Sequence, residues 1–188
     1  FSKLDYFSYF QNSGFHQPIF NPVFDRVPQI WELNEEIIYT LKKSVKNLEN
    51  KKQFSIAFPC ASYKYEAKFW SFLTAILKLR NINKIGITYK KKFSKNIIDS
   101  IPNSNIFTNK LEFLEAKSRE GIVNKICREY DFSIDMYKLG GSSLTPNLIR
   151  KGHPVFHQKT NSYFSKIQQK IFKKNKIEHL LVEKIPII

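Results

Sequence analysis

The sequence predicts an α/β fold, a Rossmann-like parallel sheet with helices on both faces. Short apolar runs that are typical of buried strands alternate along the chain with longer segments whose apolar residues recur at helical spacing. This alternation favours parallel strands joined by crossover helices, which then cover both faces of the sheet. The 188 residues are 42% hydrophobic, which is enough to form a core.

The beginning of the chain is predicted to lie outside the sheet. Residues 1–30 are aromatic and polar, and their prolines break any long helix or strand. Residues 35–48 then place isoleucine, leucine and valine side chains along one face of a helix. We therefore expect two parts: residues 1–50, a lead-in segment and a helix that packs on the core, and residues 51–188, the Rossmann-like domain.

The first half of that domain alternates strand and helix. Residues 54–58 form a short apolar run closed by a proline, which predicts a buried strand. Residues 66–80 carry a strong amphipathic helical pattern, and residues 84–89 predict a second strand. A short helix over 93–101 and a third strand over 105–108 complete this half.

The second half continues the same alternation, with apolar positions on one face of each helix. Its predicted elements are a helix over 118–129, a strand over 132–137, a short helix over 147–151, a strand over 155–157, a helix over 162–174 and a closing segment over 177–182.

A glycine-rich loop follows the strand 132–137, at the edge where parallel sheets bind ligands. Gly140 and Gly141 allow a tight turn and close backbone approach, and Ser142 and Ser143 add hydroxyl groups. The next helix directs its N–H groups toward this loop, so the arrangement suits a phosphate or diphosphate. The alternative is an ordinary connecting loop in which a serine or threonine caps the helix.

A lysine follows the first predicted strand. Lys64 ends the stretch Pro59-Cys-Ala-Ser-Tyr-Lys, and parallel strands would bring it to the same edge of the sheet as the glycine-rich loop. Lys64 would then offer a cation to a diphosphate. The alternative is one more solvated surface lysine.

The histidines offer little chemistry. His153, in a Gly-His-Pro turn, is more typical of a structural or solvated histidine than of a catalytic one. His157 and His179 have no carboxylate or cysteine partner at metal-ligand spacing. We therefore expect no metal site, and no residue is assigned as catalytic.

Cysteines and aspartates also give no site. Cys60 and Cys127 cannot form a disulfide scaffold, are expected to be small buried residues and favour a reducing, cytoplasmic location. Asp131 and Asp135 flank a strand and are not expected to work as an acid–base pair. The sequence contains no P-loop, Gly-x-Gly-x-x-Gly or Gly-x-Ser-x-Gly motif.

The net charge points to anionic partners. Lys and Arg number 31 against 16 Asp and Glu, which gives a formal charge of +15. Such an excess favours nucleic acid, an anionic surface or a phosphorylated ligand. Most of it is lysine in a chain rich in Asn, Ile and Phe, a composition typical of AT-rich coding, so ordinary solvated lysine is the alternative. No apolar run reaches the roughly 18 residues of a transmembrane helix.

Three stretches resemble one enzyme family. Residues 53–69 resemble the start of the nucleotide-sugar-binding domain in family 41 glycosyltransferases, the bacterial protein N-glucosyltransferases and their O-GlcNAc transferase relatives. Residues 130–154 resemble the family's strand, glycine loop, helix and Gly-x-Pro turn, and residues 171–182 resemble its closing helix and tail. The resemblance extends over residues 53–184.

The resemblance implies a site for the UDP part of the donor. Lys64 matches the lysine that grips the diphosphate in the family, and Ser142 and Ser143 match the loop positions that hold UDP. Asn147 stands where the family has an acidic residue near the ribose, and its amide can still hydrogen-bond a hydroxyl. The implied donor site consists of Lys64, Gly140, Gly141, Ser142, Ser143 and Asn147.

The resemblance also implies a function. The chain would be the C-terminal half of a two-domain GT-B enzyme in the cytoplasm that transfers a sugar from UDP to an acceptor, which is a protein in the bacterial members. It would need no metal or other cofactor. Because 188 residues cannot hold both halves, the acceptor groove would lie in a missing N-terminal domain or a partner chain. The alternatives are a basic nucleic-acid-binding protein and an inactive glycosyltransferase-like subunit of a larger complex.

Overall fold

The structure is a computed structural model, and every structural statement below concerns the residues that it describes. These are residues 32–59, 67–88, 109–115, 118–135, 144–161 and 163–183. The chain divides into a unit of residues 1–32 and a second unit of residues 33–188. The helix predicted over residues 35–48 therefore belongs to the same compact unit as the sheet.

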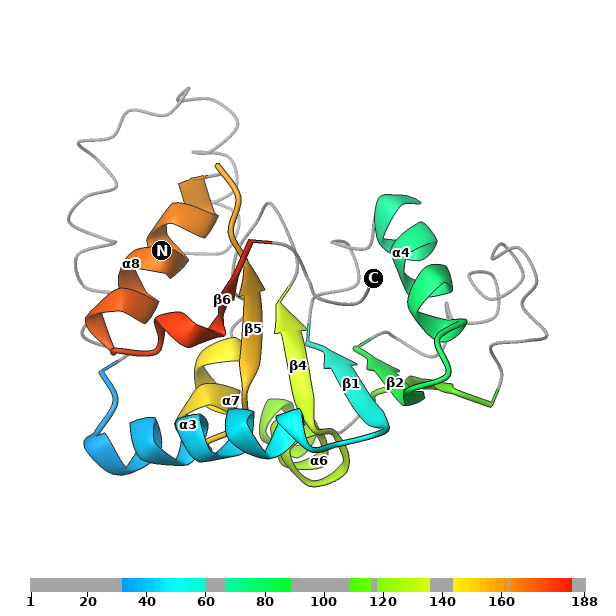
Figure 1. The fold of residues 1–188 in the computed structure, drawn as a ribbon, viewed down its shortest axis with the longest axis horizontal. Coiled ribbons are helices and arrows are strands. Elements are labelled where there is room, and N and C mark those ends of the chain that lie inside the picture. The colour runs from blue at the N-terminus through cyan, green and yellow to red at the C-terminus, as the bar shows by residue number, and fades with distance from the viewer. Residues whose placement is uncertain are drawn as a thin grey trace. The chain divides into compact units, whose positions relative to one another are not determined.

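The described residues form a parallel six-stranded sheet in the order β3-β2-β1-β4-β5-β6 (Figure 1). All five neighbouring pairs are parallel, which confirms the predicted α/β, Rossmann-like fold. The strands are β1 Phe54–Phe58, β2 Ile82–Ile87, β3 Leu111–Phe113, β4 Phe132–Asp135, β5 Val155–Gln158 and β6 Leu181–Val182.

Five described helices and one 3-10 turn accompany the sheet. They are α3 Glu35–Glu49, α4 Ala67–Leu77, α6 Arg119–Glu129, α7 Thr145–Arg150, α8 Tyr163–Lys174 and the 3-10 turn η4 Glu178–Leu180. Two of the helices begin at side-chain caps: Asn34 Oδ1 accepts the Ile37 N–H at 2.9 Å, and Ser118 Oγ accepts the Gly121 N–H at 3.0 Å. Among the described residues, no helix combines the length and the apolar character needed to cross a bilayer.

Helix α4 covers one face of the sheet. Its Phe69, Leu73 and Ile76 side chains pack with Ile56 and Phe58 of β1 in a buried apolar cluster. Ile85 and Ile87 of β2 join this cluster at alternate positions, as the period of a strand requires, together with Ile82 of β2 and Ile134 of β4. Burial of these side chains is the main source of stability on this side of the sheet.

Helices α6, α7 and α8 cover the opposite face. Ala57 of β1 and Gly86 of β2 lie side by side there, and their small size lets other groups approach the sheet closely. Helix α6 lies over this face, because its Lys125 contacts Glu112 of β3. Helices α7 and α8 contact the same face near the ends of β4 and β5. Helices therefore cover both faces, as predicted.

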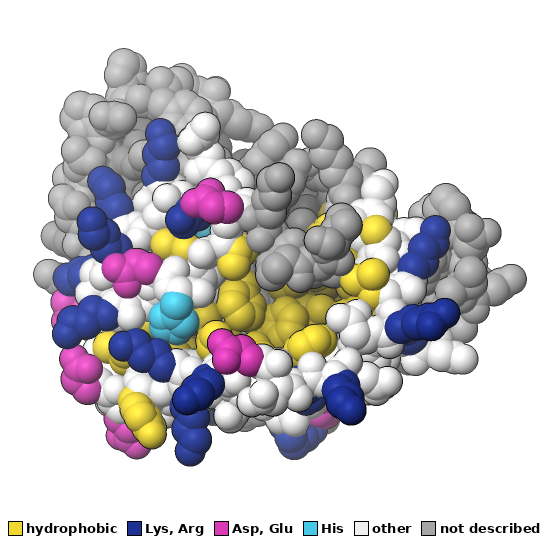
Figure 2. Space-filling view, viewed as in Figure 1, with side chains coloured by type: hydrophobic (Ala, Val, Ile, Leu, Met, Phe, Trp, Pro, Cys, Tyr) yellow, Lys and Arg dark blue, Asp and Glu magenta, His cyan; other side chains and the backbone are white. Residues whose placement is uncertain are grey.

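A row of aromatic rings crosses the sheet on the α4 face. Phe132 of β4 meets Phe54 of β1 with ring centres 5.9 Å apart and Phe156 of β5 with ring centres 5.3 Å apart, both edge to face. Figure 2 shows hydrophobic side chains at the surface in the region where Figure 1 has β1 and β4.

Several element boundaries differ from the predicted ones. Strand β2 begins at Ile82, earlier than predicted, because Ile82 pairs with Phe54 of β1. Helix α7 begins at Thr145 rather than at residue 147, and Pro146 lies in its first turn, where a missing N–H costs nothing. Strand β3 over Leu111–Phe113 was not predicted. The helix predicted over 93–101 and the strand predicted over 105–108 lie outside the described residues.

Candidate functional site

The order of the strands reverses between β1 and β4. From β1 the chain proceeds to β2 and β3 on one side, whereas β4 leads to β5 and β6 on the other side. The two strands are paired in register, Ile56 with Phe132 and Ala57 with Ser133, and their carboxyl ends lie at the same edge (Figure 1). In open parallel sheets, ligands bind in the crevice at such a switch point.

Both predicted phosphate-binding segments start at this switch point. Residues 59–66, which include Lys64, follow β1, and residues 136–144, which include Gly140–Ser143, follow β4. Lys64 and the glycine-rich loop lie outside the described residues. The structure therefore brings together the strands that carry these residues.

Asn147 is the one predicted donor-site residue within the described part of the chain. It is the third residue of α7, a helix of six residues, and its side chain is half-buried. Helix α7 begins next to the end of β4, and Asn147 lies in the first turn of this helix, which follows the predicted loop along the chain.

A cluster of buried polar side chains lies at the carboxyl ends of β4 and β5. Asp135 ends β4 and pairs in register with His157 of β5. The Asp135 carboxylate accepts the Thr145 hydroxyl at 3.0 Å, and its Oδ2 lies 3.8 Å from His157 Nδ1. Ser165 Oγ of α8 lies 3.2 Å from His157 Nε2. All four residues of the cluster are at most 1% exposed. The cluster ties β4, α7, β5 and α8 together.

Sequence reasoning missed this cluster. It assigned no carboxylate partner to His157, whereas the structure places Asp135 beside it. The contact depends on the register between β4 and β5, which the sequence does not reveal. The sequence does contain one signal for this cluster: Asp135 and His157 lie near the ends of two predicted strands that follow each other along the chain.

The cluster has the composition of a catalytic triad without the geometry of one. Ser165 Oγ accepts the Thr160 N–H at 2.9 Å and a Gln169 side-chain N–H at 3.2 Å, and a residue only 1% exposed cannot reach a substrate. The distance from His157 to Asp135 also exceeds that of a hydrogen bond. We therefore assign the cluster a structural and orienting role.

His153 is a structural histidine, as the sequence suggested. Its Nε2 lies 2.9 Å from Ser133 Oγ in the middle of the sheet, and the residue is 5% exposed. Burial lowers the pKa of His153 to about 4 and outweighs the opposing effect of the Asp131 charge. Cys127 of α6 is half-buried rather than buried, and burial raises the pKa of its thiol.

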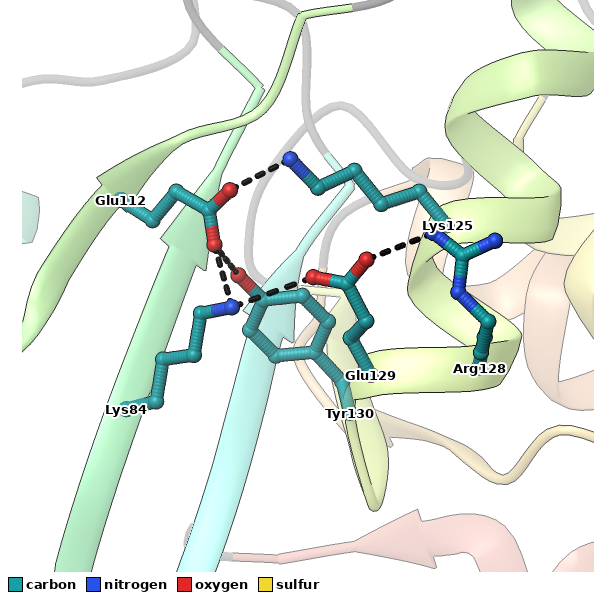
Figure 3. Close-up of polar contacts among 6 residues, drawn as sticks. All are labelled: Lys84, Glu112, Lys125, Arg128, Glu129 and Tyr130. Atoms are coloured by element: carbon teal, nitrogen blue, oxygen red, sulfur yellow. Dashed lines mark hydrogen bonds and ion pairs between the residues drawn. The ribbon is translucent and has the colours of Figure 1, made fainter.

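A second polar cluster joins β2, β3 and α6 (Figure 3). Glu112 of β3 accepts hydrogen bonds from Lys125, from the Tyr130 hydroxyl at 2.7 Å and from Lys84, whose ammonium also lies 3.2 Å from Glu129. Burial alone would raise the pKa of Glu112, but the hydrogen bonds from Lys125, Lys84 and Tyr130 hold this pKa at about 2. Each charged group of Lys84, Glu112, Lys125 and Glu129 therefore has an oppositely charged partner within the cluster.

A shallow pocket beside this cluster is lined by residues at the starts of β2 and β3, at the amino edge of the sheet. Its lining residues are Asn83, Lys84, Asn109, Lys110, Leu111 and Glu112. The charged groups Lys84 and Glu112 are already engaged with each other.

Within the described residues, no group of three His, Cys, Asp or Glu side chains could hold a metal ion. Comparison of the chain with protein-family models, curated proteins and solved structures gives no match. The functional proposal therefore rests on the topology, the geometry and the sequence of the chain itself.

Proposed function

We propose that the chain binds the UDP part of a UDP-sugar in the crevice between β1 and β4, as the donor domain of a glycosyltransferase. The observation that carries the proposal is the reversal of strand order between these two strands. In open parallel sheets, such a reversal is the place where ligands bind, beyond the carboxyl ends of the two strands. The sequence predicts diphosphate-binding residues in the two segments that follow β1 and β4, residues 59–66 and 136–144.

The residues have complementary roles in the proposed site. Lys64 supplies a cation to the diphosphate, Gly140 and Gly141 let the backbone approach it, and the hydroxyls of Ser142 and Ser143 donate hydrogen bonds. Asn147 of α7 is the candidate partner of a ribose hydroxyl. Together these groups would orient the donor and stabilise the departing diphosphate, with no residue assigned as general base.

The sequence after β1 favours a nucleotide sugar over a dinucleotide. A Rossmann sheet that binds NAD carries Gly-x-Gly-x-x-Gly after its first strand, and this chain has Pro-Cys-Ala-Ser-Tyr-Lys there. A lysine at that position suits a diphosphate held by charge rather than by a glycine-rich turn. The acceptor, which we propose to be a protein, would be bound by a further domain or a partner chain.

Calorimetric titration of the full chain with UDP tests the proposal. We expect binding that weakens about tenfold or more in Lys64→Ala, since one charge-assisted contact is lost. Lys78→Ala is the matched control. Lys78 is exposed just beyond the end of α4, and its substitution removes the same charge as Lys64→Ala does. No heat with UDP, or equal loss in both variants, would contradict the proposal.

Helix α8 favours a second candidate function, the binding of a nucleic acid. Lys166, Lys170 and Lys173 are exposed at helical spacing, and the helix contains no acidic residue. Figure 2 nevertheless shows basic side chains spread around this face of the molecule, with acidic side chains among them. Filter binding of RNA at two salt concentrations separates the candidates, because only this one predicts an affinity that falls steeply with salt.

An inactive subunit is the remaining possibility, and it concerns activity rather than binding. It predicts that UDP binds to the chain but that no sugar is transferred, even with the acceptor-binding partner present. Transfer by the assembled complex that is lost in Lys64→Ala would favour an active donor domain instead.

A further inference from the structure

The pocket at the amino edge of the sheet contains a lysine that is not part of an ion pair. Lys110 is half-buried in the pocket wall, and its ammonium donates to the Leu79 carbonyl at 3.3 Å. Among the residues that the structure describes, no carboxylate pairs with this ammonium. An ammonium group has three N–H donors, so two of those on Lys110 remain for a ligand.

The other charged groups at the pocket do not neutralise Lys110. Lys84 and Glu112, which also line the pocket, pair with each other. Glu112 pairs with Lys125 as well, and the Lys84 ammonium lies 3.2 Å from Glu129 (Figure 3). These two lysines and two glutamates balance, so the charge of Lys110 is in excess. One positive charge beside the Glu112 carboxylate suits a monoanion better than a multiply charged anion such as a diphosphate.

Two asparagines add neutral donors to the same pocket. The register between β1 and β2 shifts at Asn83, because the residues on either side of it pair with two consecutive residues of β1. Such a bulge redirects a side chain and is common beside binding sites. Asn83 and Asn109 both line the pocket and are exposed, and within the described residues neither side-chain amide forms a hydrogen bond. Their N–H groups are therefore available to a ligand.

The size of the pocket limits what it can hold. Its volume is about 190 Å³. Sites that enclose a whole small molecule or cofactor measure about 300–1,000 Å³, so this pocket fits the end group of a ligand. A carboxylate is a small monoanion whose two oxygens accept several N–H groups, and its hydrogen bonds to an ammonium are stronger than those between neutral groups.

We propose that this pocket binds one carboxylate group, which belongs to a small carboxylic acid or to an acidic side chain of a partner protein. The carboxylate accepts hydrogen bonds from the Lys110 ammonium and from the side-chain amides of Asn83 and Asn109. The pocket lies at the starts of β2 and β3, whereas the proposed UDP site lies at the carboxyl ends of β1 and β4. The inference therefore does not depend on the proposed function.

An NMR titration of the full chain with sodium acetate tests the inference, with sodium chloride at equal ionic strength as the reference. We expect the backbone amide signals of Asn83 and Lys110 to shift with saturating dependence on acetate and to stay in place with chloride. Sodium sulfate, a dianion, should bind no more tightly than acetate. The absence of a saturable acetate shift at these residues, or tighter binding of sulfate, overturns the inference.

A peptide with blocked ends and a single glutamate separates the two sources of the carboxylate. If the peptide binds more tightly than acetate, the pocket holds an acidic side chain of a protein. If it binds equally or more weakly, the pocket holds a small carboxylic acid. Both results support a carboxylate site, because both require saturable acetate binding.

Three substitutions test the assigned donors. Lys110→Gln should weaken acetate binding about tenfold, whereas Lys78→Gln, which removes the same charge from an exposed position next to Leu79, should change it less than about twofold. Asn109→Asp should also weaken binding about tenfold by repulsion, and its exposed side chain leaves the fold intact. Urea unfolding checks the stability of each variant. Equal losses in the two lysine variants, or unchanged affinity in Asn109→Asp, overturn the inference.

Discussion

The phenol ring of Tyr130 packs directly against Gly86 of β2, so closely that a Cβ on Gly86 would lie 2.5 Å from the ring. The Tyr130 hydroxyl donates to Glu112 of β3 at 2.7 Å, and the Lys84 ammonium lies 5.0 Å from the centre of the ring. Tyr130 immediately precedes β4 along the chain. Gly86 therefore makes room for the side chain that links the two halves of the sheet.

Replacing this glycine tests the contact. Gly86→Ala should reduce the free energy of unfolding by about 1–3 kcal/mol, because the added methyl group displaces the Tyr130 ring. Urea unfolding followed by circular dichroism measures the change. Gly121→Ala, in the first turn of α6, is the matched control and should be neutral or stabilising, since alanine favours a helix. A stable Gly86→Ala protein would show that the ring has space to move.

Glu112 should be the most sensitive charge in the cluster of Figure 3. Glu112→Gln weakens the hydrogen bonds from Lys84, Lys125 and Tyr130, and we expect a loss of about 1–2 kcal/mol in unfolding free energy. The control is Glu183→Gln, which breaks an ion pair to Lys159 at a side chain that is 77% exposed. That variant should change stability by less than about 0.5 kcal/mol. Equal effects of the two substitutions on the urea midpoint would contradict the account.

His153 should make the protein less stable in mild acid. Its pKa is about 4 in the folded protein and about 6.5 in the unfolded chain, so the unfolded chain binds more protons between these values. Stability is therefore lost as the pH falls through this window. Between pH 7 and pH 5.5, we expect a loss of about 1 kcal/mol from this residue.

His153→Gln provides the control for this pH dependence. Urea unfolding at the two pH values should show a clearly smaller difference for this variant than for the parent. His179 contributes with the same sign, because burial and then the Lys42 charge lower its pKa, so some dependence should remain. An unchanged difference would mean that His153 is not the group that titrates.

Much of the fold could be predicted because its strands and helices carry strong local patterns. The run from Phe54 to Phe58 is apolar except for Ser55 and is buried over its last three residues, and α4 and α6 show clear helical spacing. Strand β3 escaped prediction because Leu111–Phe113 is only three residues long and has a glutamate in its centre. That glutamate is stabilised by Lys84, Lys125 and Tyr130, which come from distant parts of the sequence.

The site could be predicted only in part. The sequence predicts binding segments after β1 and β4, because strand ends can be recognised locally, but the adjacency of the two strands depends on their order in the sheet. The contact between Asp135 and His157 depends on the register of two strands, which local patterns do not encode. Helix α7 begins before its predicted start because Pro146, although proline is typical of loops, also suits the first turn of a helix.

The location of bound UDP separates binding at the switch point from binding at the amino edge of the sheet. In an NMR titration of the full chain, we expect the backbone amide signals of Asp135 and Thr145, beside the switch point, to shift with saturating dependence on UDP. The amide signals of Asn83 and Lys110, which line the pocket at the amino edge, should stay in place. Shifts confined to Asn83 and Lys110, or no saturable shift at Asp135 and Thr145, would rule out UDP binding between β1 and β4.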